Sequence, residues 1–334
     1  MKLPFFKSRK RKAAEAEAKQ AAEAAAAAAT EPEPQATPAK PEKTAKTDRN
    51  SRSRRVPAEQ VVDSIGYALA AVPSLGPTVK AWRKLGFAVS ETYAWQGCNA
   101  AHVDLDGGGI RFLAVDTHAQ PTTVVDLVRE RLIFGAGLFG WTWACREPHR
   151  SALAIGQLAE SEFHAECEDW GDALVQIPTE LTPGAATWLE KTVETTTPSH
   201  ANSITRLDHV VLQVSASKAA AQVYEKHFGL KGRTSAMNER YYAFLKAGTS
   251  LLEIVGPLKP AEGGDGKPSH AAQGTRITGG PWGVAFGSAN IDATVTFLKM
   301  ASVEISEPHR AVQGGRITGM PAPLGGIQIA FMGD

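Results

Sequence analysis

The sequence predicts an α+β fold in which one structural unit, a strand followed by a helix and a small group of strands, recurs along the chain. Three observations lead to this prediction. An apolar, β-branched run followed by a helical run occurs within residues 207–228, and the same order returns at 282–300 and at 66–85. Further strand-like runs follow each of these pairs. Repetition of one supersecondary unit indicates tandem modules.

The clearest copy begins at residue 207. Leu207–Val214 is rich in β-branched and apolar residues, which is typical of a buried strand. Lys218–Phe228 places apolar side chains at helical spacing, and Gly229 follows it as a helix stop. Tyr241–Leu245 and Ser250–Val255 then predict two strands joined by a tight turn.

The other copies follow the same order with weaker signals. In each, a strand leads into a helix and further strands follow. A fourth copy is expected within about 139–195, where only its first strand is evident. The predicted elements are strands Gly66–Val72, Ala100–Leu105 and Ile110–Val115 with helix Thr78–Leu85, strand Gly140–Cys145, and strands Trp282–Phe286, Arg316–Thr318 and Ile327–Phe331 with helix Ile291–Met300.

The formal net charge of +1 divides into two unlike parts. Residues 1–55 hold 14 Lys and Arg against 7 Asp and Glu, a net of +7, so the remaining chain has a net of −6. Alanine dominates residues 13–29 and prolines follow, so we expect a disordered basic arm with a transient helix. At about 100–200 residues per domain, the body divides into a divergent domain, 56–200, and a regular module pair, 201–334.

Composition argues against several classes of protein. The longest nearly apolar run, Leu132–Ala144, has 13 residues, fewer than the roughly 20 that a spanning helix needs. The three cysteines show no C-x-x-C spacing, which fits a reducing cytoplasm. The acidic body argues against broad nucleic-acid binding. Phe5 and Phe6 beside Arg9–Lys12 would allow weak contact of the arm with a membrane surface, and a solubilising tail is the alternative.

The repeated βαβββ unit, with Asp-His-Val-Val-Leu in a first strand and Leu-Leu-Glu-Ile-Val in a last strand, resembles the vicinal oxygen chelate superfamily. This group contains glyoxalases, bleomycin-resistance proteins and extradiol dioxygenases. The resemblance implies curved mixed sheets around a cleft, formed within one chain or between two, so a homodimer is allowed. It also implies metal ligands on the first and last strands of each module. The residues that carry it are Leu207–Val214, His227–Leu230, Tyr241–Val255, Pro281–Asn290 and Ile327–Phe331.

Aligning the strands on that resemblance points to a divalent metal site. It places His209 and Glu253 at the ligand positions of one module, and Gly283 and Gln328 at those of the next. Imidazole and carboxylate bind Zn, Ni, Mn or Fe well, whereas an amide is a weak ligand and the second histidine of the dioxygenases is missing. His209 is alternatively a core histidine. Glu253, flanked by apolar residues, needs a cation, a histidine or a water-filled cleft.

Other positions are candidates for contacting a substrate. Arg316 would pair with a substrate carboxylate through its guanidinium fork, and a surface salt bridge is the alternative. Arg276, Tyr242 and Trp282 are the further candidates. The first module offers Tyr67 and Leu113 at the aligned positions, and neither is a strong metal ligand.

Two functions follow from these observations. A divalent metal held by His209, Glu253 and Gln328 would make the chain a metal-dependent lyase, isomerase or epimerase acting on a small oxygen-rich substrate. The missing ligand at Gly283 favours instead a non-catalytic protein of the same fold that binds a small ligand or a partner chain. The sequence identifies neither the substrate nor a general base.

Overall fold

The computed structural model describes residues 61–106, 108–160, 174–192, 197–258 and 279–334. All of these residues belong to one compact unit, Arg55–Asp334. The basic arm lies outside the described residues, so its predicted disorder stays a prediction. Among the helices described, none is both long enough and apolar enough to cross a membrane.

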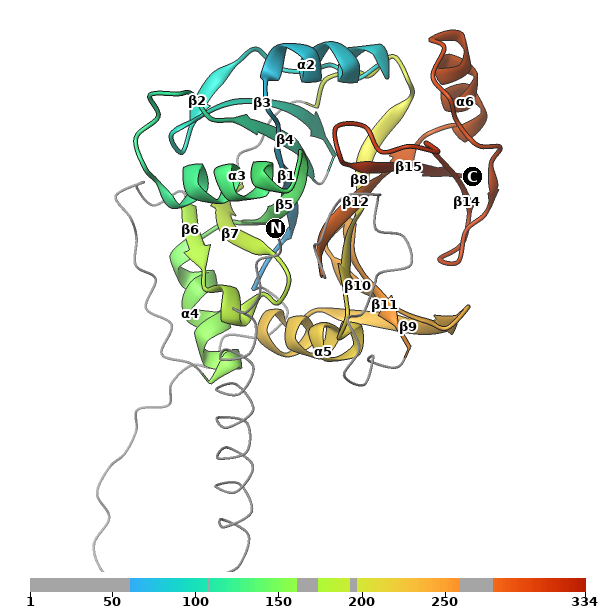
Figure 1. The fold of residues 1–334 in the computed structure, drawn as a ribbon. Coiled ribbons are helices and arrows are strands. Elements are labelled where there is room, and N and C mark those ends of the chain that lie inside the picture. The colour runs from blue at the N-terminus through green and yellow to red at the C-terminus, as the bar shows by residue number, and fades with distance from the viewer. Residues whose placement is uncertain (1–60, 107, 161–173, 193–196, 259–278) are drawn as a thin grey trace, which may run out of the picture. The chain divides into compact units, whose positions relative to one another are not determined.

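The first sheet has seven strands in the order β2-β3-β4-β1-β5-β7-β6 (Figure 1). Strand β1 runs parallel to β4 and antiparallel to β5, so the two modules of this sheet meet at their first strands. The first module is a complete βαβββ unit, of which the sequence predicts the helix and three strands but not the short strand at residues 93–95. It consists of β1 (Ser64–Ala71), α2 (Leu75–Lys84), β2 (Tyr93–Trp95), β3 (Cys98–Leu105) and β4 (Gly108–Ala114).

The second module is irregular, and a helix that the sequence analysis missed precedes it. This helix, α3 (Thr123–Ile133), is capped by Thr122, whose hydroxyl accepts a hydrogen bond of 3.1 Å from the amide of Val125. Its buried valines pack on apolar side chains of β1 and β5. The module itself contains β5 (Gly137–Cys145), α4 (Pro148–Ala159), the short 3-10 helix Thr179–Leu181, β6 (Leu174–Ile177) and β7 (Ala186–Lys191).

The second sheet has eight strands in the order β13-β14-β15-β12-β8-β11-β10-β9 and contains two complete modules. Its central strands, β8 and β12, are antiparallel, like β1 and β5 of the first sheet. The third module comprises β8 (Ile204–Val214), α5 (Ser217–Phe228), β9 (Lys231–Met237), β10 (Arg240–Ala247) and β11 (Ser250–Pro257). The fourth comprises β12 (Gly279–Ser288), α6 (Ile291–Met300), β13 (His309–Arg310), β14 (Arg316–Gly319) and β15 (Gln328–Gly333).

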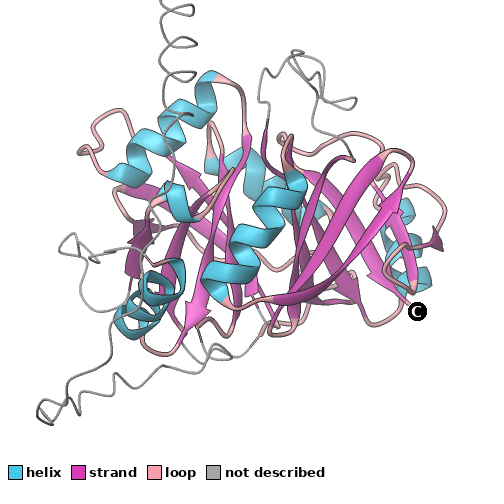
Figure 2. Ribbon diagram, turned by 90° about the horizontal axis from the view of Figure 1, so that it is seen from below, coloured by secondary structure: helices cyan, strands magenta, loops and turns pink. Residues whose placement is uncertain are grey.

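The two sheets share one hydrophobic core, and helices pack against both (Figure 2). The ring of Trp82 lies 4.9 Å from that of Phe112 in the first sheet and 5.8 Å from that of Phe286 in the second. Trp143 of β5 similarly lies 4.9 Å from Phe228 of α5. Because side chains alternate along a strand, the residues between these core positions lie on the opposite face of each sheet, here called the outer face.

The predicted α+β fold of tandem modules in curved mixed sheets is confirmed. The elements that were missed have weak apolar signals. Most side chains of β9 are exposed, so the strand carries little hydrophobic alternation. Both residues of β13 are exposed as well, and α3 lies outside the segments that carry the resemblance in sequence.

Candidate functional site

The outer face of the second sheet carries the residues that the sequence analysis proposed as metal ligands. His209 on β8 and Glu253 on β11 alternate with the core residues Val210 and Leu252. The β8–β12 pairing shifts between His209 and Leu207, which leaves Asp208 as an extra residue in β8. This irregularity lets the side chains of Asp208 and His209 meet, although consecutive strand residues normally point to opposite faces.

These side chains form a continuous chain of charged hydrogen bonds. The Nδ1 atom of His209 lies 3.0 Å from Oδ1 of Asp208, and its Nε2 atom lies 3.0 Å from Oε2 of Glu253. The other oxygen of Asp208 accepts a hydrogen bond of 2.9 Å from Nη2 of Arg206. The side chain of His209 is 3% exposed, whereas that of Glu253 is 13% exposed. The side chain of Asp208 is 14% exposed and that of Arg206 40%, so solvent reaches both ends of the chain and His209 is its buried centre.

The two carboxylates fix the charge of His209. Burial alone would lower its pKa, but hydrogen bonds to Asp208 and Glu253 outweigh burial and raise the pKa to about 9. Burial alone would raise the pKa of Asp208, but the hydrogen bond from His209 and the charge of Arg206 lower it below the usual value. At neutral pH the ring of His209 is thus a cation between two anions. The cationic partner that Glu253 requires is His209 itself.

This donor set fits a divalent metal poorly. An imidazole that donates from both nitrogens has no lone pair left for a metal. Among the residues that the structure describes, no group of three His, Cys, Asp or Glu is arranged to hold a metal ion. The amide nitrogen of Gln328 donates to the carbonyl oxygen of Met320 at 2.6 Å. The assignment of His209, Glu253 and Gln328 as metal ligands stays a prediction. The hydrogen bonds of His209 and Gln328 do not favour it, because they occupy atoms of both side chains.

The strand register also changes which residues of the fourth module are equivalent to this pair. His209 pairs with Leu251, so Glu253 lies two residues beyond the partner of His209. Gly283 pairs directly with Gln328, so the residue two positions further is Ala330. The fourth module therefore offers Gly283 and Ala330 at these positions, and neither side chain can bind a metal.

The four proposed substrate contacts lie in different places. Both terminal nitrogens of Arg316 donate to Asp292, at 2.9 and 2.8 Å, in an exposed ion pair. Tyr242 lies on β10 and its ring stacks on Phe244 with a centroid distance of 6.3 Å. Trp282 is 38% exposed, at an irregularity in the β12–β8 pairing. Arg276 lies outside the described residues. No contact joins Arg316, Tyr242 or Trp282 to His209 among the described interactions.

A second polar site, which the sequence analysis did not foresee, lies on the outer face of the first sheet. It is found in the same way as the equivalents of Glu253 in the fourth module, by taking the residue two positions beyond the strand partner of each first-strand residue. Tyr67 pairs with Gly109, so the counterpart of Glu253 in the first module is Arg111, not Leu113. In the second module Thr142 pairs with Trp188, so the counterpart is Glu190. Thr142 lies opposite Tyr67, whose amide donates to the threonine hydroxyl at 2.8 Å.

Arg111 is the centre of this second site. Its terminal nitrogens donate to the two oxygens of Glu190 at 2.9 and 3.3 Å. Its guanidinium lies 4.0 Å from the ring centroid of Tyr67 and 4.4 Å from that of Trp95. The residue is 5% exposed. Burial alone would lower its pKa, but the carboxylate of Glu190 keeps the pKa above the usual value.

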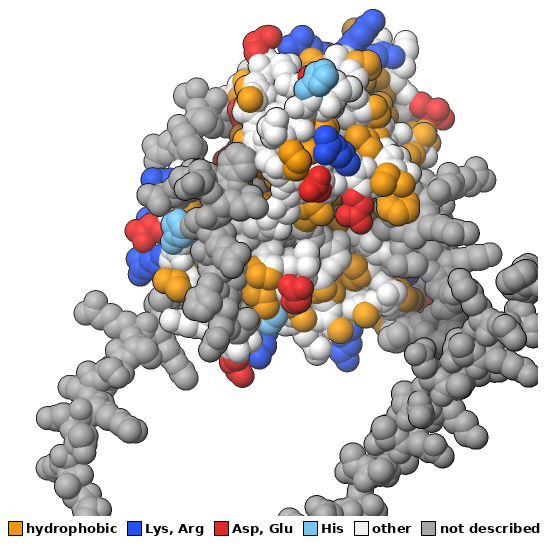
Figure 3. Space-filling view, turned by 60° about the vertical axis from the view of Figure 1, so that its left-hand side comes forward, with side chains coloured by type: hydrophobic (Ala, Val, Ile, Leu, Met, Phe, Trp, Pro, Cys, Tyr) orange, Lys and Arg blue, Asp and Glu red, His pale blue; other side chains and the backbone are white. Residues whose placement is uncertain are grey.

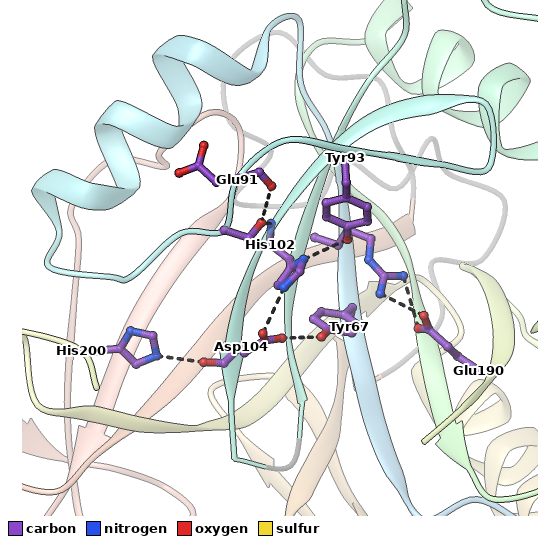
Figure 4. A network of polar contacts seen from close by, with 9 residues as sticks. Tyr67, Glu91, Tyr93, His102, Asp104, Glu190 and His200 are labelled. Carbon is purple, nitrogen blue, oxygen red and sulfur yellow. Dashed lines mark hydrogen bonds and ion pairs between the residues drawn. The ribbon is translucent and has the colours of Figure 1, made fainter. Parts of the chain in front are cut away.

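A chain of hydrogen bonds joins Tyr67, Asp104, His102 and Tyr93 in the same site (Figure 4). The hydroxyl of Tyr67 donates to Oδ1 of Asp104, and Nε2 of His102 lies 3.0 Å from Oδ2 of the same carboxylate. The other ring nitrogen of His102 lies 2.9 Å from the hydroxyl of Tyr93. The hydrogen bond from His102 lowers the pKa of Asp104. Burial, with the hydrogen bond to Asp104, raises the pKa of Tyr67.

Figure 3 shows the charged side chains on one face of the molecule. On the face drawn in Figure 3, acidic and basic side chains are scattered among apolar ones, without a broad area of one sign.

The match to a family model agrees with this geometry. Residues 206–331 match the model of the Glyoxalase/Bleomycin resistance protein/Dioxygenase superfamily, as the resemblance in sequence predicts. The matched segment covers the third and fourth modules. A search of curated proteins gave no match.

Solved structures extend the likeness to the first sheet. One is a xylose isomerase-like TIM barrel/4-hydroxyphenylpyruvate dioxygenase fusion protein, with a TM-score of 0.57 and 17% identity over 81% of this chain and 49% of that chain. Another is a triple mutant of 4-hydroxymandelate synthase from Streptomyces coelicolor, with a TM-score of 0.56 and 14% identity over 81% of this chain and 92% of that chain. The chain spans about half the length of the fusion protein. At these identities the likeness establishes the fold alone.

Proposed function

We propose that this chain is a small-molecule-binding protein of the glyoxalase superfamily whose C-terminal module pair uses a buried charge chain in place of a divalent metal. The observation that carries the proposal is the position of His209, with each ring nitrogen 3.0 Å from a carboxylate oxygen. The carboxylates of Asp208 and Glu253 are balanced by the cations of His209 and Arg206, without a metal ion. Burying such charges without partners would be costly, and here every one of them has a partner.

Glu253 is the residue most suited to contact a ligand. Its Oε2 atom is bound to His209, and Oε1 has no hydrogen-bond partner among the described residues. A carboxylate with one free, partly exposed oxygen can accept a hydrogen bond from a hydroxyl or amide of a ligand. The ion pair with His209 holds the carboxylate of Glu253 in place.

A metal-dependent lyase or isomerase is the alternative function. The placement of His209 and Glu253 on the first and last strands of one module supports it. It requires Zn, Ni, Mn or Fe to displace the proton between their side chains, and the fourth module supplies no further imidazole or carboxylate at the equivalent positions. A cytoplasmic location, a homodimer and a membrane contact of the arm stay predictions.

Metal titration separates the two functions. Wild-type protein and the Glu253→Gln variant are titrated calorimetrically with Zn²⁺, Ni²⁺, Mn²⁺ and Fe²⁺, with Glu304→Gln as a control at an exposed glutamate. We expect no stoichiometric binding that depends on Glu253. One equivalent of tightly bound metal in the wild type and the control, lost in Glu253→Gln, would show that the metal-dependent function is correct.

Ligand binding is tested with the same three proteins. A thermal-shift screen of small diacids, phenols and thiol adducts would identify compounds that stabilise the wild type. We expect the effect of such compounds to persist in Glu304→Gln and to be lost in Glu253→Gln. Equal stabilisation of all three proteins would refute the role of Glu253.

A further inference from the structure

The outer face of the first sheet contains a ligand-sized cavity beside the Arg111 cluster. Its volume is about 320 Å³, at the lower end of the range typical of small-molecule sites. It opens between the two modules of the first sheet, and its lining comes from both of them. The described lining includes Ser64, Tyr67, Asp104, Asp106, Arg111, Glu190, Lys191, Thr192 and Thr197.

We propose that this cavity is a second binding site and that it takes an uncharged, polyhydroxylated ligand of monosaccharide size or smaller. The site is separate from the Glu253 site and does not depend on the function proposed for it. Two independent observations indicate a ligand site. One is the cavity itself, and the other is Arg111, a nearly buried lining residue whose Nε atom has no partner among the described residues.

The charge balance of the lining argues against an ionic ligand. Both terminal nitrogens of Arg111 are occupied by Glu190, so the guanidinium is already neutralised. The carboxylate of Asp104 is held by the hydroxyl of Tyr67 and the ring of His102. Neither buried charge needs a counter-ion from a ligand.

The hydrogen-bonding groups of the lining suit hydroxyl groups. Carboxylates accept hydrogen bonds and an ammonium group donates them, while serine and threonine hydroxyls do both. Asp106 and Lys191 bring one group of each charged kind to the rim, and both residues are exposed. Ser64, Thr192 and Thr197 add hydroxyls that can adapt to either role. A ligand with neighbouring hydroxyls presents donors and acceptors side by side and matches this mixture.

An ion pair and two cation–π contacts fix the side chain of Arg111 in the cavity wall. Arg111 belongs to the first module and Glu190 to the second, 79 residues later, and their ion pair joins the two modules across the cavity wall. The stacking of Arg111 between Tyr67 and Trp95 fixes the guanidinium further. A site on a rigid wall loses little entropy when it binds a ligand.

The proposal is tested by calorimetry on the full chain. The probes are D-xylose, myo-inositol and glycerol, with D-glucosamine as a cationic probe and D-glucuronate as an anionic probe. We expect saturable binding of at least one neutral probe and weaker binding of both charged probes. Binding of a charged probe alone would overturn the ligand class, and binding of no probe at all would overturn the site.

Variants locate the binding. Thr192→Trp fills the rim of the cavity from an exposed position, and Thr296→Trp on α6 is the matched control. Asp106→Asn removes one charged acceptor at the rim. We expect Thr192→Trp and Asp106→Asn each to weaken binding about tenfold or more, with Thr296→Trp unchanged. Equal affinities in all variants would place the probe elsewhere and refute the proposal, while Glu253→Gln should leave this binding intact.

Discussion

The two sheets of this protein use one architecture but distribute polar residues differently at equivalent positions. In the second sheet the third module carries His209 and Glu253, whereas the fourth carries Gly283 and Ala330. Its charge chain is therefore confined to one module. In the first sheet both modules contribute, and the ion pair between Arg111 and Glu190 joins them. The Arg111–Glu190 pair thus connects two modules, whereas the charge chain of the second sheet leaves Oε1 of Glu253 without a partner among the described residues.

The largest expected effect on stability comes from removing the ion pair between Arg111 and Glu190 in the first sheet. Arg111→Met should lower the free energy of unfolding by about 3 kcal/mol, because it leaves Glu190 partly buried without its partner. Adding Glu190→Met should recover much of that loss. Urea unfolding of the two single variants and the double variant measures both effects. If the loss of unfolding free energy in the double variant equals the sum of the losses in the two single variants, Arg111 and Glu190 are not coupled.

The charge chain of the second sheet should give a pH-dependent stability. His209 has a folded pKa of about 9 and an ordinary value near 6.5, so its contribution is complete below pH 6.5 and is lost as pH rises through 9. The loss should amount to about 3 kcal/mol of unfolding free energy. Denaturant unfolding between pH 6 and 9.5 measures it, and His209→Gln should flatten that slope. A wild-type slope no steeper than that of His209→Gln would contradict the charge assignment.

A smaller effect is expected at Tyr67. The Tyr67→Phe variant removes the hydroxyl that donates to Asp104, which should cost about 1 kcal/mol of stability and raise the pKa of Asp104. Unfolding curves and carboxyl-carbon NMR titration measure these changes, with Tyr242→Phe as the control. An unchanged Asp104 titration would show that the hydrogen bond is not formed.

The smallest effect is expected at Arg316. Its ion pair with Asp292 is exposed, and solvent screens such pairs. Arg316→Ala should change the unfolding midpoint less than any variant above and should leave small-molecule binding unaltered. A clear loss of ligand affinity in the thermal-shift screen would instead support the earlier hypothesis that Arg316 binds a substrate carboxylate.

The sequence predicts the fold well because apolar alternation and helix stops are local signals. It also indicates that His209 and Glu253 belong together, since each interrupts an apolar strand at a matching place in one module. The contribution of Asp208 depends on an extra residue in β8, which appears only in the strand pairing. Local patterns give no warning of such an irregularity.

Register explains the other differences. Alternation shows which face of a sheet a residue lies on, but it does not show how far along the neighbouring strand its partner lies. Gln328 and Leu113 are on the outer faces, as the alignment implies, yet they are one pleat repeat away from the positions equivalent to Glu253. Correcting that offset identifies Arg111 and Ala330. The pairing of Arg111 with Glu190 spans 79 residues and has no local sequence signature.

The central claim is that His209 is a cation held by two carboxylates and not a metal ligand. The most direct measurement is the ¹⁵N NMR spectrum of histidine-labelled protein at pH 7.5, with the His209 signals assigned from the His209→Gln variant. We expect both ring nitrogens of His209 to be protonated, with no change after one equivalent of Zn²⁺. A neutral ring at pH 7.5, or signals that shift with Zn²⁺ in the wild type but not in Glu253→Gln, would contradict the claim.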